Sequence, residues 1–300
     1  MDFHNVVLSN ALASPYLFFR LDTSVGNVVY CQATSYDDNE NVRIYWGDGA
    51  FTDIPSKSLE QMQHTYAEAG QYMLAIECHG NGLSRIKFDN TTANIIASNE
   101  SWSYHPGMTK LYFGYNAKSL LSFTSIPSVA TDLNFAFYDS PEALLPIKKL
   151  PDGITTMQGA FRMDANALLP FEELPASLTG DGGINAFSGC SKAVSKITRI
   201  PEGCTDISGM FYRCSLMDIR IDRLPANVTS IKQTFDKSAA KINLDELAAN
   251  APDGGYQALA DIHGAFYENM NVTGSRSRFL SVCPNVQDTE WAFAGTSTVE

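Results

Sequence analysis

The chain has 300 residues, 44% of them hydrophobic and 18% charged, so it is long enough for two ordinary domains and too apolar to be disordered. Its 21 basic and 33 acidic residues leave a net charge of −12, which disfavours binding to nucleic acids and to anionic membrane surfaces. No segment approaches the roughly 18 consecutive apolar residues of a transmembrane helix, so we expect no membrane insertion.

The first 22 residues, MDFHNVVLSNALASPYLFFRLD, have neither the basic start nor the continuous apolar stretch of a signal peptide. Two explanations stay open for an exported protein: a leader has been removed, or the protein leaves its cell without one.

Residues 1–98 contain short segments in which apolar side chains alternate with polar ones. We predict β-strands at 27–33, 42–46 and 71–78, separated by Gly-rich turns such as Gly47-Asp48-Gly49. Short alternating strands with such turns indicate an antiparallel β-sandwich.

Two motifs in this region point to a family. YWGDG at 45–49 is followed by HTYAEAGQY at 64–72, and the pair resembles the polycystic-kidney-disease (PKD) type of immunoglobulin-like domain. The resemblance covers about a third of the chain. It implies a PKD-like sandwich over 1–98 that serves as a spacer or adhesion module and has no catalytic residues.

The residues of these motifs are all expected to have structural roles. Trp46 should fill the space between the sheets, and Gly47 and Gly49 should have positive φ angles. The Asp48 carboxylate should cap backbone N–H groups in the turn, and Tyr66 should tie a loop to the next strand.

The acidic loop YDDNEN, residues 36–41, has two interpretations. Its oxygen ligands suit calcium, with Asp37, Asp38 and Glu40 as the candidate ligands, although the spacing matches no EF-hand. Clusters of Asp and Asn are also ordinary turn formers. The polar segment NESWSYHPGM, residues 99–108, is predicted to be a linker.

From residue 109 to residue 300 the chain is periodic. An aromatic anchor recurs at intervals of 24 to 31 residues, and an apolar residue followed by Pro keeps the same period; five of these prolines lie 14 residues after the preceding anchor. ALLPIKKLP at 143–151 and ALLPFEELP at 167–175 are near copies. The anchors are Phe113, Phe137, Phe161, Phe187, Phe211, Phe235, Phe266 and Phe293.

Such a period predicts a solenoid of about eight repeats, in which each repeat buries its apolar face against its neighbours. With DISGMFYRC at 206–214 as its clearest copy, the pattern resembles the BspA-like leucine-rich repeats of bacterial surface proteins. One repeat is enlarged by an insertion at 244–262 with helical spacing. The expected fold class is therefore mainly β: an immunoglobulin-like sandwich followed by a leucine-rich-repeat-like β-solenoid with short helical or irregular connections.

The six cysteines do not form a metal-binding pattern, since no CxxC occurs. The repeat accounts for four of them as small buried side chains. Cys31 and Cys78 lie on predicted strands, and either a disulfide or two buried thiols is compatible with the sequence. The five histidines are scattered and are expected to be structural, so no cofactor other than calcium is predicted.

Catalytic motifs are absent: the sequence has no GxSxG, no GxxxxGK[ST] and no GxGxxG after a strand. One feature suits recognition. The residue after the anchor is Tyr138, Arg162, Tyr212 or Tyr267 in four repeats, and stacked repeats would align these side chains. The alternative is that they only lie along the surface beside the anchors.

These features predict a non-enzymatic adhesion or receptor-recognition protein outside the cell, on a phage particle as a tail or head fibre, or on a bacterial surface. The expected partner is a cell-surface glycan or protein, with other virion or surface proteins as further candidates. A purely structural virion or assembly protein, whose solenoid packs on sister chains as a homo-oligomer, is the alternative. An enzyme is the third possibility.

Overall fold

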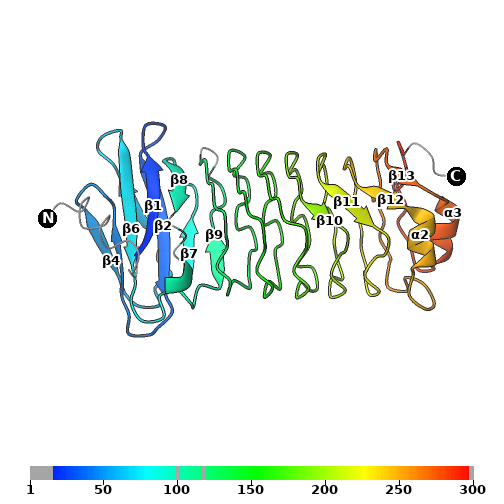
Figure 1. Ribbon diagram of the computed structural model, residues 1–300, viewed down its shortest axis with the longest axis horizontal. Helices are drawn as coiled ribbons and strands as arrows, with labels where there is room; N and C mark the ends of the chain where they lie inside the picture. The colour runs from blue at the N-terminus through cyan, green and yellow to red at the C-terminus, as the bar shows by residue number, and fades with distance from the viewer. Residues whose placement is uncertain (1–15, 99, 101, 117–118, 297–300) are drawn as a thin grey trace.

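The computed structural model describes residues 16–98, 100, 102–116 and 119–296 (Figure 1). This part of the chain is mainly β, with several sheets and no closed barrel among its described residues. Most strands lie at the N-terminal end, and the rest of the chain makes successive turns side by side along the long axis of the molecule (Figure 1).

The N-terminal strands form two sheets, with the orders β4-β3-β6-β1-β8 and β5-β2-β7-β9. Neighbouring strands are antiparallel except β7 and β9, which are parallel. The three segments predicted from their alternation correspond to β2, β3 and β6. The strands are β1 (Tyr16–Asp22), β2 (Val28–Ser35), β3 (Val42–Tyr45), β4 (Phe51–Ile54), β5 (Met62–Thr65), β6 (Gln71–Glu77), β7 (Leu83–Phe88), β8 (Asn94–Ser98) and β9 (Lys110–Tyr112).

The turn after β3 has the geometry that its residues predict. Gly47 and Gly49 have φ angles of 91° and 96°. Asp48 Oδ1 accepts a hydrogen bond from the Ala50 N–H at 3.0 Å. Trp46 is buried, and its carbonyl accepts a hydrogen bond of 2.7 Å from the Tyr66 hydroxyl. The predicted roles of these side chains are confirmed.

The segment expected to be a linker is packed against the rest of the molecule. It contains a 3₁₀ helix at Trp102–Tyr104, and Trp102, His105 and Met108 are buried; residues 99 and 101 lie outside the described residues. The ring of Phe113 lies 5.9 Å from that of Phe19 and 5.6 Å from that of Phe88. A single apolar core therefore continues from the N-terminal sheets into the periodic region.

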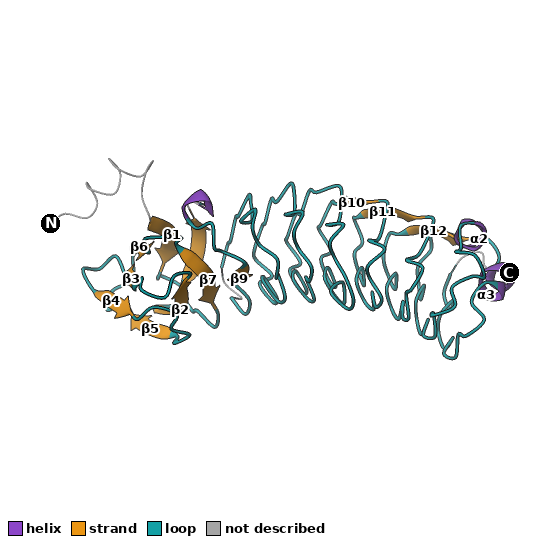
Figure 2. Cartoon of the chain, turned by 90° about the horizontal axis from the view of Figure 1, so that it is seen from below, coloured by secondary structure: helices purple, strands orange, loops and turns teal. Residues whose placement is uncertain are grey.

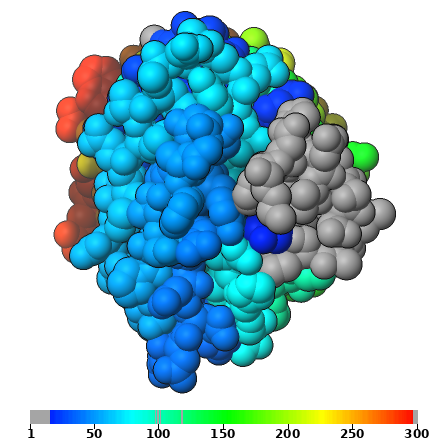
Figure 3. Space-filling model, turned by 90° about the vertical axis from the view of Figure 1, so that its left-hand side faces the viewer, coloured from blue at the N-terminus to red at the C-terminus, as the bar shows by residue number. Residues whose placement is uncertain are grey.

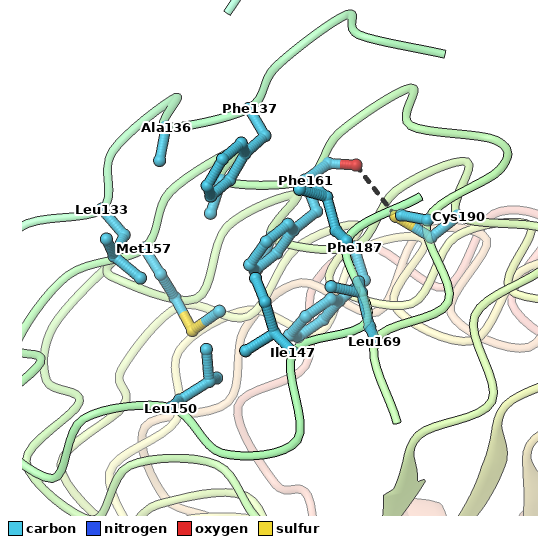
Figure 4. Packing of buried hydrophobic residues seen from close by; sticks show 14 of the residues in the cluster. Leu133, Ala136, Phe137, Ile147, Leu150, Met157, Phe161, Leu169, Phe187 and Cys190 are labelled. Atoms are coloured by element: carbon cyan, nitrogen blue, oxygen red, sulfur yellow. Dashed lines mark hydrogen bonds between the residues drawn. The ribbon is translucent and has the colours of Figure 1, made fainter. Parts of the chain in front are cut away.

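From Phe113 on, each repeat makes one turn of the chain, which we call a coil and name after its anchor. The anchor rings stack in one column, with 5.5 to 6.1 Å between neighbouring centroids and interplanar angles of 4° to 24°. Figure 4 shows three of them, Phe137, Phe161 and Phe187, one behind the other. The 24-residue step arises because each anchor must return to its neighbour's side.

Backbone hydrogen bonds join the coils at every step. The N–H of each anchor donates to the carbonyl of the residue that precedes the next anchor, at 2.5 to 3.1 Å in all seven steps. The residue two positions after each anchor has a positive φ angle, and so does the residue two before each anchor from Phe137 on. Turns that contain such residues let the backbone point alternate N–H groups at the next coil.

Position three after the anchor is buried and polar in every coil whose burial is described, up to Asn269. Its side chain donates to the carbonyl of an anchor: Ser140 Oγ to Phe113 O at 3.1 Å, and Cys190 Sγ to Phe161 O at 2.8 Å, the dashed line of Figure 4. The residues at this position are Asn116, Ser140, Asp164, Cys190, Cys214, Ser238, Asn269 and Thr296.

Further along the coils, four short strands form a parallel sheet across neighbouring coils (Figure 2). They are β10 (Lys196–Ile197), β11 (Asp218–Ile221), β12 (Lys241–Asn243) and β13 (Val272–Thr273). The insertion predicted to be helical contains α2 (Leu244–Ala249), which packs against α3 (Arg276–Ser281). At the other end, residues of the N-terminal sheets cover most of the molecule in the end-on view of Figure 3.

Candidate recognition surface

The four recognition candidates lie at equivalent places on one side of the coils. Tyr138, Arg162, Tyr212 and Tyr267 each follow an anchor, and each is partly exposed. The anchor points into the core, so the next side chain points outward. The structure therefore brings these side chains to a common face, which we call the aromatic strip together with the exposed aromatic, Met and cationic side chains that contact them.

The strip has its densest part on the first three coils. The ring of Tyr138 lies 5.0 Å from Tyr115 and 5.8 Å from Phe135, and the guanidinium of Arg162 lies 5.6 Å from the Tyr138 centroid. Tyr115 is 46% exposed, Phe135 38% and Met163 48%. This is an aromatic and apolar surface with one cation held over a ring.

A second part lies on the last coils. Lys237 Nζ is 4.9 Å from the Tyr267 centroid, and the Trp291 ring meets that of Tyr267 at 6.0 Å, edge to face. Trp291 is 56% exposed. Hydrogen bonding to Glu268 and its negative charge raise the pKa of Tyr267, so its hydroxyl stays protonated and able to donate at neutral pH.

Between the two parts, the column of aromatic side chains is interrupted. The coil of Phe187 has Ser188 after its anchor and that of Phe235 has Asp236, and both are buried. Tyr212 stands between them and contacts Arg213, whose guanidinium is 5.0 Å from its ring. The four candidates share a face but do not form one unbroken row.

Sequence reasoning missed half of the strip. Tyr115, Phe135, Met163 and Trp291 lie two residues before or after an anchor, at the positions with positive φ. An alignment of the repeats would have shown large apolar residues there, but only the turn geometry shows that they point to solvent. The surface has the means to stack on flat apolar ligands and to donate hydrogen bonds, which are the contacts of recognition sites.

The calcium candidates do not converge. Asp37 accepts two hydrogen bonds from Asn81, which lower its pKa, and Asp38 lies 3.5 Å from the Lys57 ammonium. Glu40 is not grouped with them at ligand distances. Calcium binding at this loop stays a prediction.

Among the described residues, one group of three side chains has ligand atoms close enough for a metal ion: His263, Asp288 and Glu290, within 4.8 Å of one another. They lie on the last two coils, and His263 Nδ1 is 3.4 Å from Asp288 Oδ2. All three are at least partly exposed, so an ion pair with a protonated imidazole accounts for the arrangement equally well.

The six cysteines are buried free thiols, so Cys31 and Cys78 adopt the thiol alternative. Burial raises the pKa of the Cys78 thiol to about 12, and it raises that of Cys31 further, which leaves both unreactive at neutral pH. His105 is also buried, and desolvation lowers its pKa to about 4, so it is neutral. His64 stacks on Trp46 and bonds Asp48 at 2.7 Å, a structural role.

One hollow in the N-terminal sheets has a volume of about 380 Å³ and an open mouth. It is lined by Val28, Tyr30, Gln61, Asn90 and Thr92, and it holds no carboxylate, imidazole or thiol. Its side chains offer one ring and several hydrogen-bonding groups.

Comparison of the chain with protein families, curated proteins and solved structures found no match. None of the described helices has the length and apolar composition that crossing a bilayer requires.

Proposed function

We propose that this is a non-enzymatic recognition protein that binds a cell-surface glycan or protein through the aromatic strip. The observation that carries the proposal is the cluster of Tyr115, Phe135, Tyr138, Arg162 and Met163 on a rigid stack of hydrogen-bonded coils. Exposed aromatic, Met and Arg side chains gathered in this way are typical of binding surfaces.

The finer fold assignment belongs to the same proposal. The turn around Trp46, Asp48 and Tyr66 supports an immunoglobulin-like sandwich of the PKD type. The stacked anchors and the hydrogen bonds between coils support a solenoid of BspA-like leucine-rich repeats. A sandwich joined to such a solenoid suits display on a phage fibre or a bacterial surface, where the sandwich adds reach.

The test is binding to intact bacterial cells and to a glycan array. Tyr138→Ala combined with Arg162→Ala should weaken binding about tenfold or more, since it removes the centre of the strip. Phe51→Ala is the matched control: this ring is 56% exposed and lies under the Arg43 guanidinium, far from the coils. Equal binding by the double variant and the unaltered protein would contradict the proposal.

A second candidate function is structural, and a specific surface favours it. Five consecutive coils expose one aliphatic side chain each at equivalent places, and they are 40% to 60% exposed. We call this row the aliphatic ridge: Leu120, Leu144, Leu168, Val194 and Leu216. Stable association of copies without any binding to cells or glycans would favour this role.

A further inference from the structure

The aliphatic ridge is the most regular apolar feature of the surface. Leu168 N–H donates to Leu144 O at 2.7 Å, and Val194 N–H donates to Leu168 O at 2.9 Å, so these three side chains sit directly beside one another. Neighbouring hydrogen-bonded strands lie about 4.8 Å apart, and the ridge repeats at this spacing. A scattered exposed leucine needs no explanation, but a row in register across coils does.

The ridge continues sideways over a half-buried proline in two coils. In the coils of Phe137 and Phe161 the side chains alternate between exposed and buried: Leu144 is exposed, Leu145 buried, Pro146 half-buried, Ile147 buried and Lys148 exposed. The next coil repeats the pattern from Leu168 through Pro170 to Glu172. Each coil therefore presents a Leu, a Pro and a charged side chain on one face.

The charges on these two coils are opposite. Lys148 and Lys149 follow Pro146, and Glu172 and Glu173 occupy the same places 24 residues later. All four are exposed. Within the described part of the chain, Lys148, Glu172 and Glu173 form no ion pair, and Lys149 pairs only with Asp152, at 3.2 Å.

We propose that this face binds a second copy of the chain, in a two-fold symmetric dimer with the coils antiparallel. The axis lies in the face, along the chain direction of the exposed segments and midway between the coils of Phe137 and Phe161. That rotation exchanges the two coils and keeps each place along the coil.

The arrangement matches both the apolar and the charged groups. Leu144 meets Leu168 of the second copy, and Leu120 meets Val194. Lys148 and Lys149 meet Glu172 and Glu173, and the symmetry repeats each contact. Opposite charges that face each other set the register of an interface, and parallel alignment would place like charges together. No other neighbouring pair of coils carries this inversion of charge.

The dimer is expected to be weak. The ridge and its charged border span four coils, or about 15 Å along the column, which is smaller than the roughly 800 Å² per partner of a stable interface. Dissociation in the micromolar range follows, and the dimer becomes significant where copies are concentrated, as on a particle or cell surface.

Sedimentation velocity of the full chain over a range of concentrations tests the proposal. Glu172→Lys with Glu173→Lys makes both sides of the interface basic, and Lys148→Glu with Lys149→Glu makes both sides acidic. Each double variant should lose at least about tenfold in association. An equimolar mixture of the two should recover it as a heterodimer, because Lys on one chain then faces Glu on the other.

General charge effects cannot mimic this result. The first variant lowers the negative net charge of the chain and the second raises it, so a mere change in repulsion would move their association in opposite directions. Lys232→Glu, at an exposed position beside the anchors, is the single-charge control and should associate like the unaltered chain. Circular dichroism checks that each variant is folded.

Two outcomes would overturn the proposal: an unaltered chain that is monomeric at about 100 μM, or a mixture that associates no more than its components. The inference does not depend on the aromatic strip. Tyr138→Ala with Arg162→Ala should leave association unchanged, so failure of the dimer and failure of the proposed recognition are separate results.

Discussion

Asp164 departs from its equivalents at the residue scale. The side chains three positions after the other anchors carry a proton to donate, and Ser140 and Cys190 donate it to an anchor carbonyl. Asp164 is fully buried, its Oδ1 accepts the Ser140 N–H at 2.8 Å, and its Oδ2 has no partner. Burial raises the pKa of this carboxyl well above its ordinary value. The protonated acid is the form that can donate as its equivalents do.

Replacing Asp164 should change how stability depends on pH. Because its pKa is higher in the folded state, the folded chain holds the proton longer, and stability falls as pH rises above the ordinary value of 3.8. Asp164→Ser should remove this decline and raise the free energy of unfolding at pH 8 by about 1–3 kcal/mol. Urea denaturation at pH 5 and pH 8 measures it.

Asp152→Ser is the control, since its carboxylate is 85% exposed. It should leave the slope of stability against pH unchanged. A less stable Asp164→Ser protein at pH 8 would show that the ionised carboxylate is stabilised by some group that this structure does not place beside it.

At the scale of one coil, two requirements meet around each anchor. The ring must stack in the column, and the residues two positions away must have positive φ. Some coils use Gly there and others use residues such as Asn185 and Gln233. A non-Gly residue in this conformation costs about 1–2 kcal/mol, so the hydrogen bonds between coils hold some residues in a strained conformation.

Gly209→Ala should therefore destabilise the chain by about 1–2 kcal/mol. Gly209 has a φ of 64°, and a Cβ there would lie 2.2 Å from Asn185 Oδ1 in the preceding coil. Thermal unfolding followed by circular dichroism measures the loss. Gln233→Ala is the matched control in the next coil: it keeps a Cβ at a φ of 52° and should change stability little. Equal effects of the two would argue against strain at this position.

The whole molecule has one continuous core, although its sequence has two parts. Phe113 is the centre of the junction: its ring neighbours Phe19 and Phe88 on one side and Phe123 and Phe137 on the other. The packed segment with Trp102 and His105 closes the same junction. The two parts should therefore depend on each other for stability.

Phe113→Ala should cost about 3–5 kcal/mol through the cavity that it leaves. Hydrogen exchange should then show faster opening both in β1 and in the coil of Phe137. Phe235→Ala is the matched control, because it leaves a similar cavity in the column but far from the sheets. If Phe113→Ala accelerated exchange only in the coils, the two parts would be independently stable.

The sequence alone was enough to predict the strands β2, β3 and β6, the turn at Gly47 and Gly49, and the period of the anchors. These features depend on local rules: alternation, turn chemistry and regular spacing are written along the chain. It also identified four side chains of the aromatic strip, since the residue after a buried anchor must point outward.

Only the tertiary structure decided which distant residues meet. The packing of the segment at 102–108, the interruption of the strip at Ser188 and Asp236, and the register of the aliphatic ridge depend on contacts between residues 20 or more positions apart. The predicted linker looked polar, yet Trp102 and His105 are buried, because burial is a property of the neighbours that fold around a segment. Spacing specifies that the coils repeat, while the geometry of the turns specifies where each side chain points.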